Sequence, residues 1–264
     1  MRAMKAIDTD WGRVGCSVEG EGGTALLFLH GVGSDRSAWD GQLARFGQER
    51  MAIAIDMPGY GDSEFGPEEG SARTEFAHAA MSLLDALGVE RAHVCGLSLG
   101  GIIAFEMVRL APERVASLVL ADTFARHPEG QAIHDRSLAA AASLGMAGLA
   151  DSRVDALLAQ PADPVVRASV VATMAKIDPA AYARAAEAVW LADQHRVAAS
   201  VACPTLILYG SEDRITPPEL SEELKTIIPQ AGLVEIAGAG HLPNLERPDV
   251  FNRVLAAFLA EVEG

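Results

Sequence analysis

Short apolar runs alternate along the chain with longer segments in which apolar residues recur at helical spacing. Continuous apolar or β-branched runs are typical of strands buried on both faces, and such strands belong to parallel sheets. We expect strands at Ala25–Leu29, Met51–Ile55, Ala92–Cys95, Leu118–Ala121, Thr205–Tyr209 and Leu233–Ile236. The helical spacing predicts helices at Trp39–Phe46, Arg73–Leu87, Leu99–Leu110 and Pro248–Val262. This alternation implies right-handed crossovers and an α/β fold with a mostly parallel, doubly wound sheet.

One long region interrupts the alternation. Residues 124–196 contain no strand-like run, only alanine-rich helical sequence divided by glycines and prolines, and the alternation resumes at Thr205. We interpret 124–196 as a helical cap inserted within one domain, whose core comprises residues 1–123 and 197–264. A separately folding domain is the alternative. Because ligands bind at the carboxyl-terminal edge of open α/β sheets, we expect the cap to cover that edge.

The composition is that of a globular, acidic protein. The chain has 264 residues, of which 50% are hydrophobic, and a mean hydropathy of +0.17, so one α/β domain can bury a large core. A net charge of −15 disfavours nucleic acid and anionic membranes as partners. No apolar segment follows Arg2 and Lys5 as in a signal peptide, and none is long enough to span a membrane. We therefore expect a cytoplasmic protein that acts on a small molecule.

The strongest chemical signal is a serine between glycines, Gly96-Leu97-Ser98-Leu99-Gly100, which lies between a predicted strand and a predicted helix. A sharp strand-to-helix turn brings backbone segments so close that the flanking positions need glycine, and it lifts the serine hydroxyl above the sheet. The amide of Leu99 then lies unpaired at a helix N-terminus, where the helix dipole favours an anion. This context predicts that Ser98 is a nucleophile and that Leu99 is one donor of an oxyanion hole. An ordinary glycine-rich turn is the alternative.

The first predicted strand is followed by His30-Gly31-Val32-Gly33. In sites of this kind the second oxyanion donor comes from the backbone of this loop, and small residues let that backbone face the pocket. We assign the second donor to Val32. His30 lies at the wrong place in the chain order for a base, and we expect it to fix the loop through a hydrogen bond.

A serine nucleophile of this type needs an acid and then a base later in the chain. His241 lies in a glycine-rich loop after the last predicted strand, where its imidazole can reach the serine. Asp213 follows the strand Thr205–Tyr209, and a carboxylate there would orient the imidazole and stabilise its charged form. Asp122, at the end of the preceding strand, is a rival for this role, and Glu212 is a weaker one.

Asp56 begins a turn whose proline and glycines specify a tight loop, so we expect Asp56 to organise that loop and not to catalyse. The remaining histidines do not have the spacing of metal ligands: His78, His93, His127, His134 and His195. We expect neither a metal nor another cofactor.

Together these motifs resemble the α/β-hydrolase superfamily over nearly the whole chain. The matching set comprises the His-Gly-x-Gly loop, the D-x-P-G-x-G-x-S turn, the G-x-S-x-G elbow, G-x-x-D and the late G-x-G-H. Within the superfamily, the elbow GLSLGG and the stretch from Leu118 to Thr123 look most like 3-oxoadipate enol-lactonases. Asp122 stands where those lactonases usually have asparagine. The resemblance implies an α/β-hydrolase fold with a helical cap and a Ser98–Asp213–His241 triad.

The resemblance further implies a serine hydrolase that cleaves a carboxylic ester or lactone through an acyl-enzyme, with an enol-lactone of aromatic catabolism as a candidate substrate. The alternatives are a carbon–carbon bond hydrolase of the meta-cleavage type and a non-catalytic ligand-binding protein of the same fold. A carboxylated substrate must meet local positive charge on this acidic protein. We expect that charge from one of the cap arginines Arg126, Arg136, Arg153, Arg167 and Arg184, and we favour Arg126 or Arg136 near the start of the cap. We include Trp190 among the substrate-binding residues.

Overall fold

The computed structural model describes residues 3–67 and 70–264, which form one eight-stranded sheet in the order β1-β2-β4-β3-β5-β6-β7-β8. The strands are β1 (Ala3–Thr9), β2 (Gly12–Glu19), β3 (Ala25–Leu29), β4 (Ala52–Ile55), β5 (Ala92–Leu97), β6 (Val115–Ala121), β7 (Thr205–Gly210) and β8 (Gly232–Ile236). From β4 to β8 all neighbouring strands are parallel, whereas β2 pairs antiparallel with both β1 and β4. The predicted α/β fold with a mostly parallel sheet is therefore confirmed.

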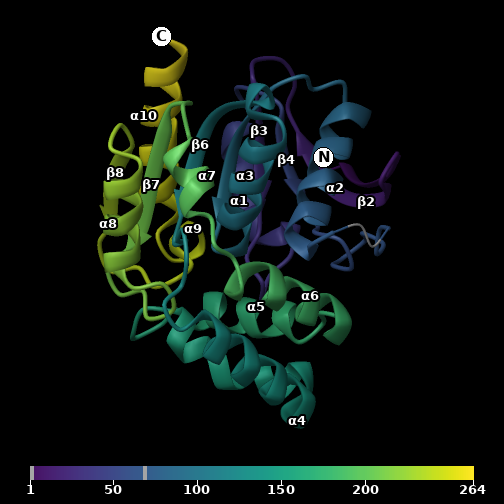
Figure 1. Ribbon diagram of the computed structural model, residues 1–264, viewed down its shortest axis with the longest axis vertical. Helices are drawn as coiled ribbons and strands as arrows, with labels where there is room; N and C mark the ends of the chain where they lie inside the picture. Colours follow the sequence, from purple (N-terminus) through teal and green to yellow (C-terminus); the bar gives the residue numbers. More distant parts are fainter. Residues whose placement is uncertain (1–2, 68–69) are drawn as a thin grey trace.

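Helices cover both faces of this sheet (Figure 1). Outside the region between β6 and β7 they are η1 (Arg36–Trp39), α1 (Asp40–Phe46), α2 (Ala72–Ala86), α3 (Leu99–Leu110), η2 (Pro112–Arg114), α8 (Pro218–Ile227), α9 (Pro243–Glu246) and α10 (Pro248–Glu263). Strand side chains alternate between the two faces. Leu27 and Leu29 of β3 pack with α2 and α3 in one core, while Leu26 and Phe28 pack with α1 and α10 in the other. Buried on both sides, β3 consists only of apolar residues.

The region between β6 and β7 is helical, as the sequence predicts. Residues 122–204, all of which are described, contain no strand. Their helices are α4 (Gly130–Leu157), α5 (Pro164–Met174), α6 (Pro179–Trp190) and α7 (His195–Ala199). The side chains of Asp163 and Asp178 cap α5 and α6 by accepting amide hydrogen bonds, and a proline follows each aspartate at the first helical position.

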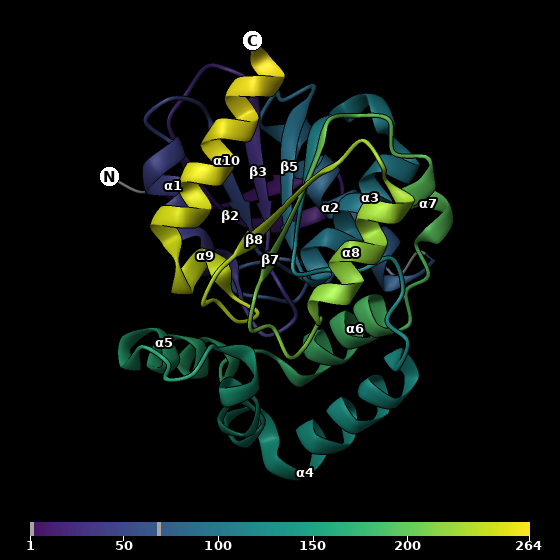
Figure 2. The same ribbon diagram turned by 90° about the vertical axis from the view of Figure 1, so that its left-hand side faces the viewer.

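Helices α4, α5 and α6 lie together at one end of the sheet (Figures 1 and 2). Helix α4 is broken at Gly145, whose φ of 67° and ψ of 172° are not helical, so its second half turns in a different direction from its first. Helix α6 packs on α4 and also on α2 and α3. The position of these helices matches the predicted cap, while the division of the chain into core and cap remains a prediction.

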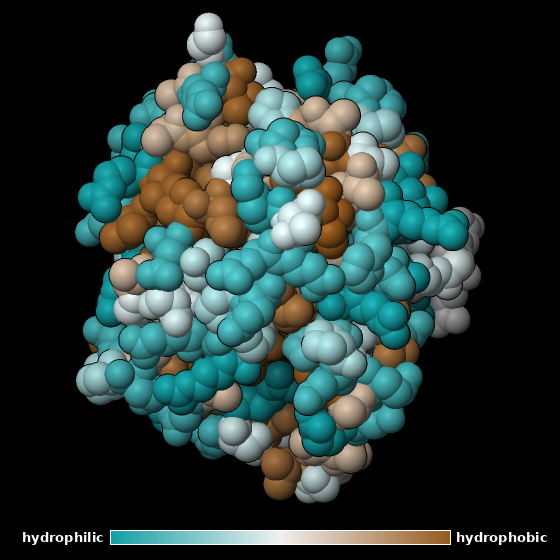
Figure 3. All heavy atoms as spheres, turned by 60° about the vertical axis from the view of Figure 1, so that its left-hand side comes forward, coloured by the Kyte–Doolittle hydropathy of each residue, from teal (hydrophilic) through white to brown (hydrophobic). Residues whose placement is uncertain are grey.

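The surface is mixed in polarity. Figure 3 shows a face on which hydrophilic side chains predominate and hydrophobic residues gather in separate patches, as is usual for a globular protein. Among the described residues, no helix combines the length and apolar character needed to cross a membrane.

Candidate active site

Ser98 occupies the turn between β5 and α3, in the strand–turn–helix context that the sequence predicts. Its φ of 55° and ψ of −114° are rare for a residue with a side chain, and its amide donates a hydrogen bond of 2.9 Å to the carbonyl of Ala121. The turn is tight enough that a Cβ on Gly96 would collide with the carbonyl of Gly100, and one on Gly100 with the carbonyl of Leu29. The backbone therefore holds Ser98 rigidly in a strained conformation.

Two backbone amides near Ser98 are free to bind an anion. Within the described residues neither the amide of Leu99, at the start of α3, nor that of Val32 donates a hydrogen bond. The loop of Val32 is fixed by His30, whose Nδ1–H donates to the Gly31 carbonyl at 2.9 Å and whose Nε2 accepts from the Met57 amide at 3.0 Å. These bonds confirm the expected role of His30 and need a neutral imidazole. Burial supplies it, because it lowers the pKa of His30.

Asp213 and His241 form a buried hydrogen-bonded pair. Nδ1–H of His241 donates to Asp213 Oδ2 at 2.8 Å, which leaves Nε2 of the imidazole available. The carboxylate also accepts the amides of Ile215 and Thr216, at 2.7 and 3.1 Å, and the Thr216 hydroxyl at 2.5 Å. Burial by itself raises the pKa of Asp213, but the charge and hydrogen bond of His241, together with the bonds from residues 215 and 216, lower it below its ordinary value. Asp213 is thus held as a carboxylate.

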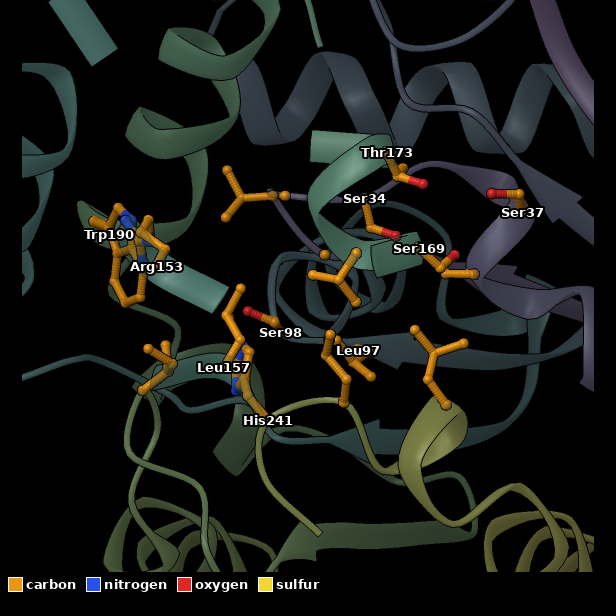
Figure 4. A pocket seen from close by; sticks show the side chains of 18 residues that line it. Ser34, Ser37, Leu97, Ser98, Arg153, Leu157, Ser169, Thr173, Trp190 and His241 are labelled. Carbon is orange, nitrogen blue, oxygen red and sulfur yellow. The ribbon is translucent and has the colours of Figure 1, made fainter. Parts of the chain in front are cut away.

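Ser98 and His241 line the same cavity, whose volume is about 60 Å³. Figure 4 shows both side chains at its wall, with Ser169 and Thr173 of α5 above them in the view. Ser98 Oγ is buried and, among the described residues, has no hydrogen-bond partner. A larger cavity of about 650 Å³ adjoins this one, since Arg153, Trp190 and Ile215 line both. The serine hydroxyl therefore faces a small inner chamber with a wider outer chamber beside it.

The cation at the inner cavity is Arg153, and this differs from the expectation. Arg136 lines only the outer cavity, Arg126 lines neither, and Trp190 lines both. The break of α4 at Gly145 explains the difference, because the second half of the helix folds back beside the first half. Arg153, on the second half, donates from Nη1 to Ser137 Oγ on the first half at 2.9 Å.

The rival acid, Asp122, lies at the same edge of the sheet but does not hold the imidazole. It accepts the Gly210 amide at 2.8 Å, whereas Nδ1–H of His241 donates to Asp213. One potential ligand atom each of Asp122, Asp213 and His241 lies within 4.8 Å of the others, a spacing that could suit a metal ion. In the structure Asp213 Oδ2 accepts Nδ1–H of His241 and the Thr216 hydroxyl.

Two further polar residues support the site and were not predicted. Thr216 bonds Asp213, and the only sequence signal for it is its position shortly after the acid. Glu246 accepts the amides of Gly240 and Ala159 at 2.9 and 2.7 Å, and so ties the loop of His241 to the end of α4. A glutamate beyond a glycine-rich loop carries no pattern that identifies this role. Asp56, as expected, organises its loop by accepting the amides of Arg36 and Asp62.

Comparisons with known proteins agree with this geometry. The model of the alpha/beta hydrolase family matches residues 26–254. A dihydrolipoyllysine-residue acetyltransferase component of an acetoin cleaving system from Pseudomonas putida is 30% identical over 91% of this chain, which spans 64% of the length of that relative. The 3-oxoadipate enol-lactonase 1 of Acinetobacter baylyi is 27% identical, with 92% of this chain and 91% of the relative aligned.

A thermophilic esterase from Thermogutta terrifontis has a similar structure, with a TM-score of 0.87, 28% identity and full coverage of both chains. The matches confirm the resemblance to α/β hydrolases and, within them, to enol-lactonases. The family match extends over most of the chain, and the sheet and the serine turn agree with it, so the chain belongs to the alpha/beta hydrolase family.

Proposed function

We propose that this protein is a serine hydrolase that cleaves a carboxylic ester or lactone through an acyl-enzyme. The observation that carries the proposal is the buried Asp213–His241 pair beside a strained serine at the wall of the same cavity. Ester and lactone chemistry also fits the relatives, since an enol-lactonase and an esterase are similar to the chain over nearly its whole length.

In the proposed reaction, Ser98 Oγ attacks the carbonyl carbon while His241 Nε2 takes the hydroxyl proton. The carboxylate of Asp213 stabilises the resulting imidazolium. The amides of Val32 and Leu99 bind the oxyanion of the tetrahedral intermediate. When the intermediate collapses, the carbon–oxygen bond to the alcohol breaks and His241 gives its proton to the leaving oxygen. A water molecule, activated by the same imidazole, then hydrolyses the ester on Ser98 and releases the acid.

The cavities favour a small ester or lactone that also carries a free carboxylate. The inner cavity, with a volume of about 60 Å³, is small, which suits a short acyl group. Arg153 donates to the hydroxyls of Ser137 and Tyr182, and among the described residues it has no carboxylate partner. Trp190 Nε1 is buried without an acceptor. We therefore assign to Arg153 and Trp190 the binding of the substrate carboxylate, in place of Arg126 and Arg136.

Replacing the nucleophile tests the mechanism. Ser98→Ala should lower kcat for a short p-nitrophenyl ester by about 10⁶-fold, because the acyl carrier is gone, while the melting temperature stays close to that of the unchanged protein. Ser169→Ala is a matched control, since Ser169 lines the same cavity from α5 and has no proposed role in the chemistry. A phosphonylating reagent should label Ser98, as located by peptide mass spectrometry. Similar activity of the two alanine variants would refute the serine mechanism.

A further inference from the structure

Asp122 is a second buried carboxyl beside the acid of the proposed triad. Asp122 follows β6 and Asp213 follows β7, and these strands are neighbours in the sheet, so both carboxyls reach the same edge. Asp122 is fully buried, and the side chain of Asp213 is buried as well. Two buried carboxylates so close together would repel each other strongly without water to screen them.

The hydrogen bonds around Asp122 are incomplete unless it carries a proton. Its Oδ1 accepts the Gly210 amide at 2.8 Å, whereas Oδ2 is buried with no donor beside it. The polar group next to it is the Asp213 carboxyl, which is placed to share a hydrogen bond with Asp122. Asp213 already accepts from His241 and Thr216 and is therefore the ionised member of the pair. A proton on Asp122 turns this contact from repulsion into a hydrogen bond to a charged acceptor.

The surrounding charges favour the same state. Burial, and next the negative charge of Asp213, raise the pKa of Asp122 well above its ordinary value, and the charge of Glu246 adds to this effect. The Gly210 amide acts in the opposite direction and is outweighed. His241, on the neighbouring loop, directs its Nδ1–H to Asp213 and not to Asp122.

We propose that Asp122 is a positioning residue that stays protonated and donates a hydrogen bond to Asp213, so that the Asp213 carboxylate keeps the orientation in which it accepts Nδ1–H of His241. This role rests on the proposed function. The proton remains on Asp122 throughout the reaction and is not transferred to substrate. At alkaline pH, loss of that proton removes the donor and places a second negative charge beside Asp213, so activity should fall.

Two substitutions separate this role from a purely conformational one. Asp122 has a φ of 44°, in the left-handed region, so its backbone conformation is itself a constraint. Asp122→Gly tolerates that backbone but removes the donor, and it should lower kcat roughly ten- to a hundredfold with KM little changed, as expected for one hydrogen bond to a charged group. Asp122→Asn keeps an acceptor for Gly210 and a donor for Asp213. It should retain kcat within about threefold and lose the alkaline decline in activity.

Infrared spectroscopy tests the protonation state without relying on activity. The unchanged protein at neutral pH should show the carbonyl band of a buried carboxylic acid, and that band should be missing in Asp122→Asn and present in the Ser98→Ala variant. The proposal is overturned if the band is the same with and without Asp122, or if Asp122→Asn loses as much kcat as Asp122→Gly. Neither result would bear on whether Ser98 is the nucleophile, which the label on Ser98 decides separately.

Discussion

Neutralising Arg153 should separate charged substrates from neutral ones. Arg153 lies at the junction of the inner and outer cavities and, among residues 3–67 and 70–264, donates only to the uncharged hydroxyls of Ser137 and Tyr182, at 2.9 and 3.2 Å. Its guanidinium can therefore bind a substrate carboxylate without first breaking an ion pair. Arg153→Gln keeps a donor for the hydroxyls and removes the charge.

The magnitude follows from the environment of this side chain. A hydrogen bond to a charged group contributes about 1.5 to 3 kcal/mol, and the partial exposure of Arg153 places it toward the lower end of that range or just below. A loss of about 1 to 2 kcal/mol corresponds to a decrease of roughly 5- to 30-fold in kcat/KM. Because the carboxylate is bound in both the ground state and the transition state, the loss should appear mainly in KM.

The assay compares two p-nitrophenyl esters of equal chain length, one with a terminal carboxylate and one with a terminal methyl group. For Arg153→Gln we expect the decrease on the charged ester alone. Arg136→Gln is the matched control, because Arg136 is exposed and, of the two cavities, lines only the outer one. Its Nη2 lies 3.6 Å from Oε2 of Glu129. Equal losses on both esters, or a greater charge-dependent loss for Arg136→Gln, would show that the carboxylate is bound elsewhere or not at all.

Two further outcomes follow from the site. Asp213→Asn should lower kcat by about 10⁴-fold, because an amide no longer fixes the imidazole tautomer. Steady-state kinetics should show a far smaller decrease in kcat for Asp122→Asn. The reverse ranking would assign the role of the acid to Asp122. The lowered pKa of buried His30 means that the unfolded chain binds a proton more readily than the folded one, so the free energy of unfolding should decrease as pH falls below about 6.5. Urea titrations across this range should show that the free energy of unfolding depends less on pH in His30→Gln than in the unchanged protein. An equal dependence on pH in both would contradict the neutral, buried state of His30.

The sequence pattern predicts most of the sheet, because strands buried on both faces are mostly apolar. It predicts Ala25–Leu29 and Leu99–Leu110 with the bounds that the structure has. It does not predict the hairpin of β1 and β2, where glycines and charged residues interrupt the apolar run of an antiparallel edge. Local pattern marks an element only where burial is continuous along it.

The candidate site divides in the same way. Ser98, Asp213 and His241 could be proposed from the sequence because each follows a strand in a turn or loop with glycine nearby, and the hydrogen bond between Asp213 and His241 agrees with the predicted pairing. Arg153 could be named only as one of five candidate cap arginines, since its place at the inner cavity depends on the break of α4 at Gly145. The sequence also gives no means to tell how Asp122 and Asp213 share a proton, because that depends on burial and on the distance between the two carboxyls.

The bond between the His241 amide and the Leu157 carbonyl, at 2.8 Å, limits how substrate and product can move. Glu246 reinforces it, since it accepts amides from both the His241 loop and Ala159. If this end of α4 lifted away, the loop that carries the proposed base would lose its anchor at the same moment. Substrate and product should therefore enter and leave through the outer cavity while the end of α4 stays bound to the His241 loop. A chimaera that carries the cap helices of a relative would need to keep residues 157–159.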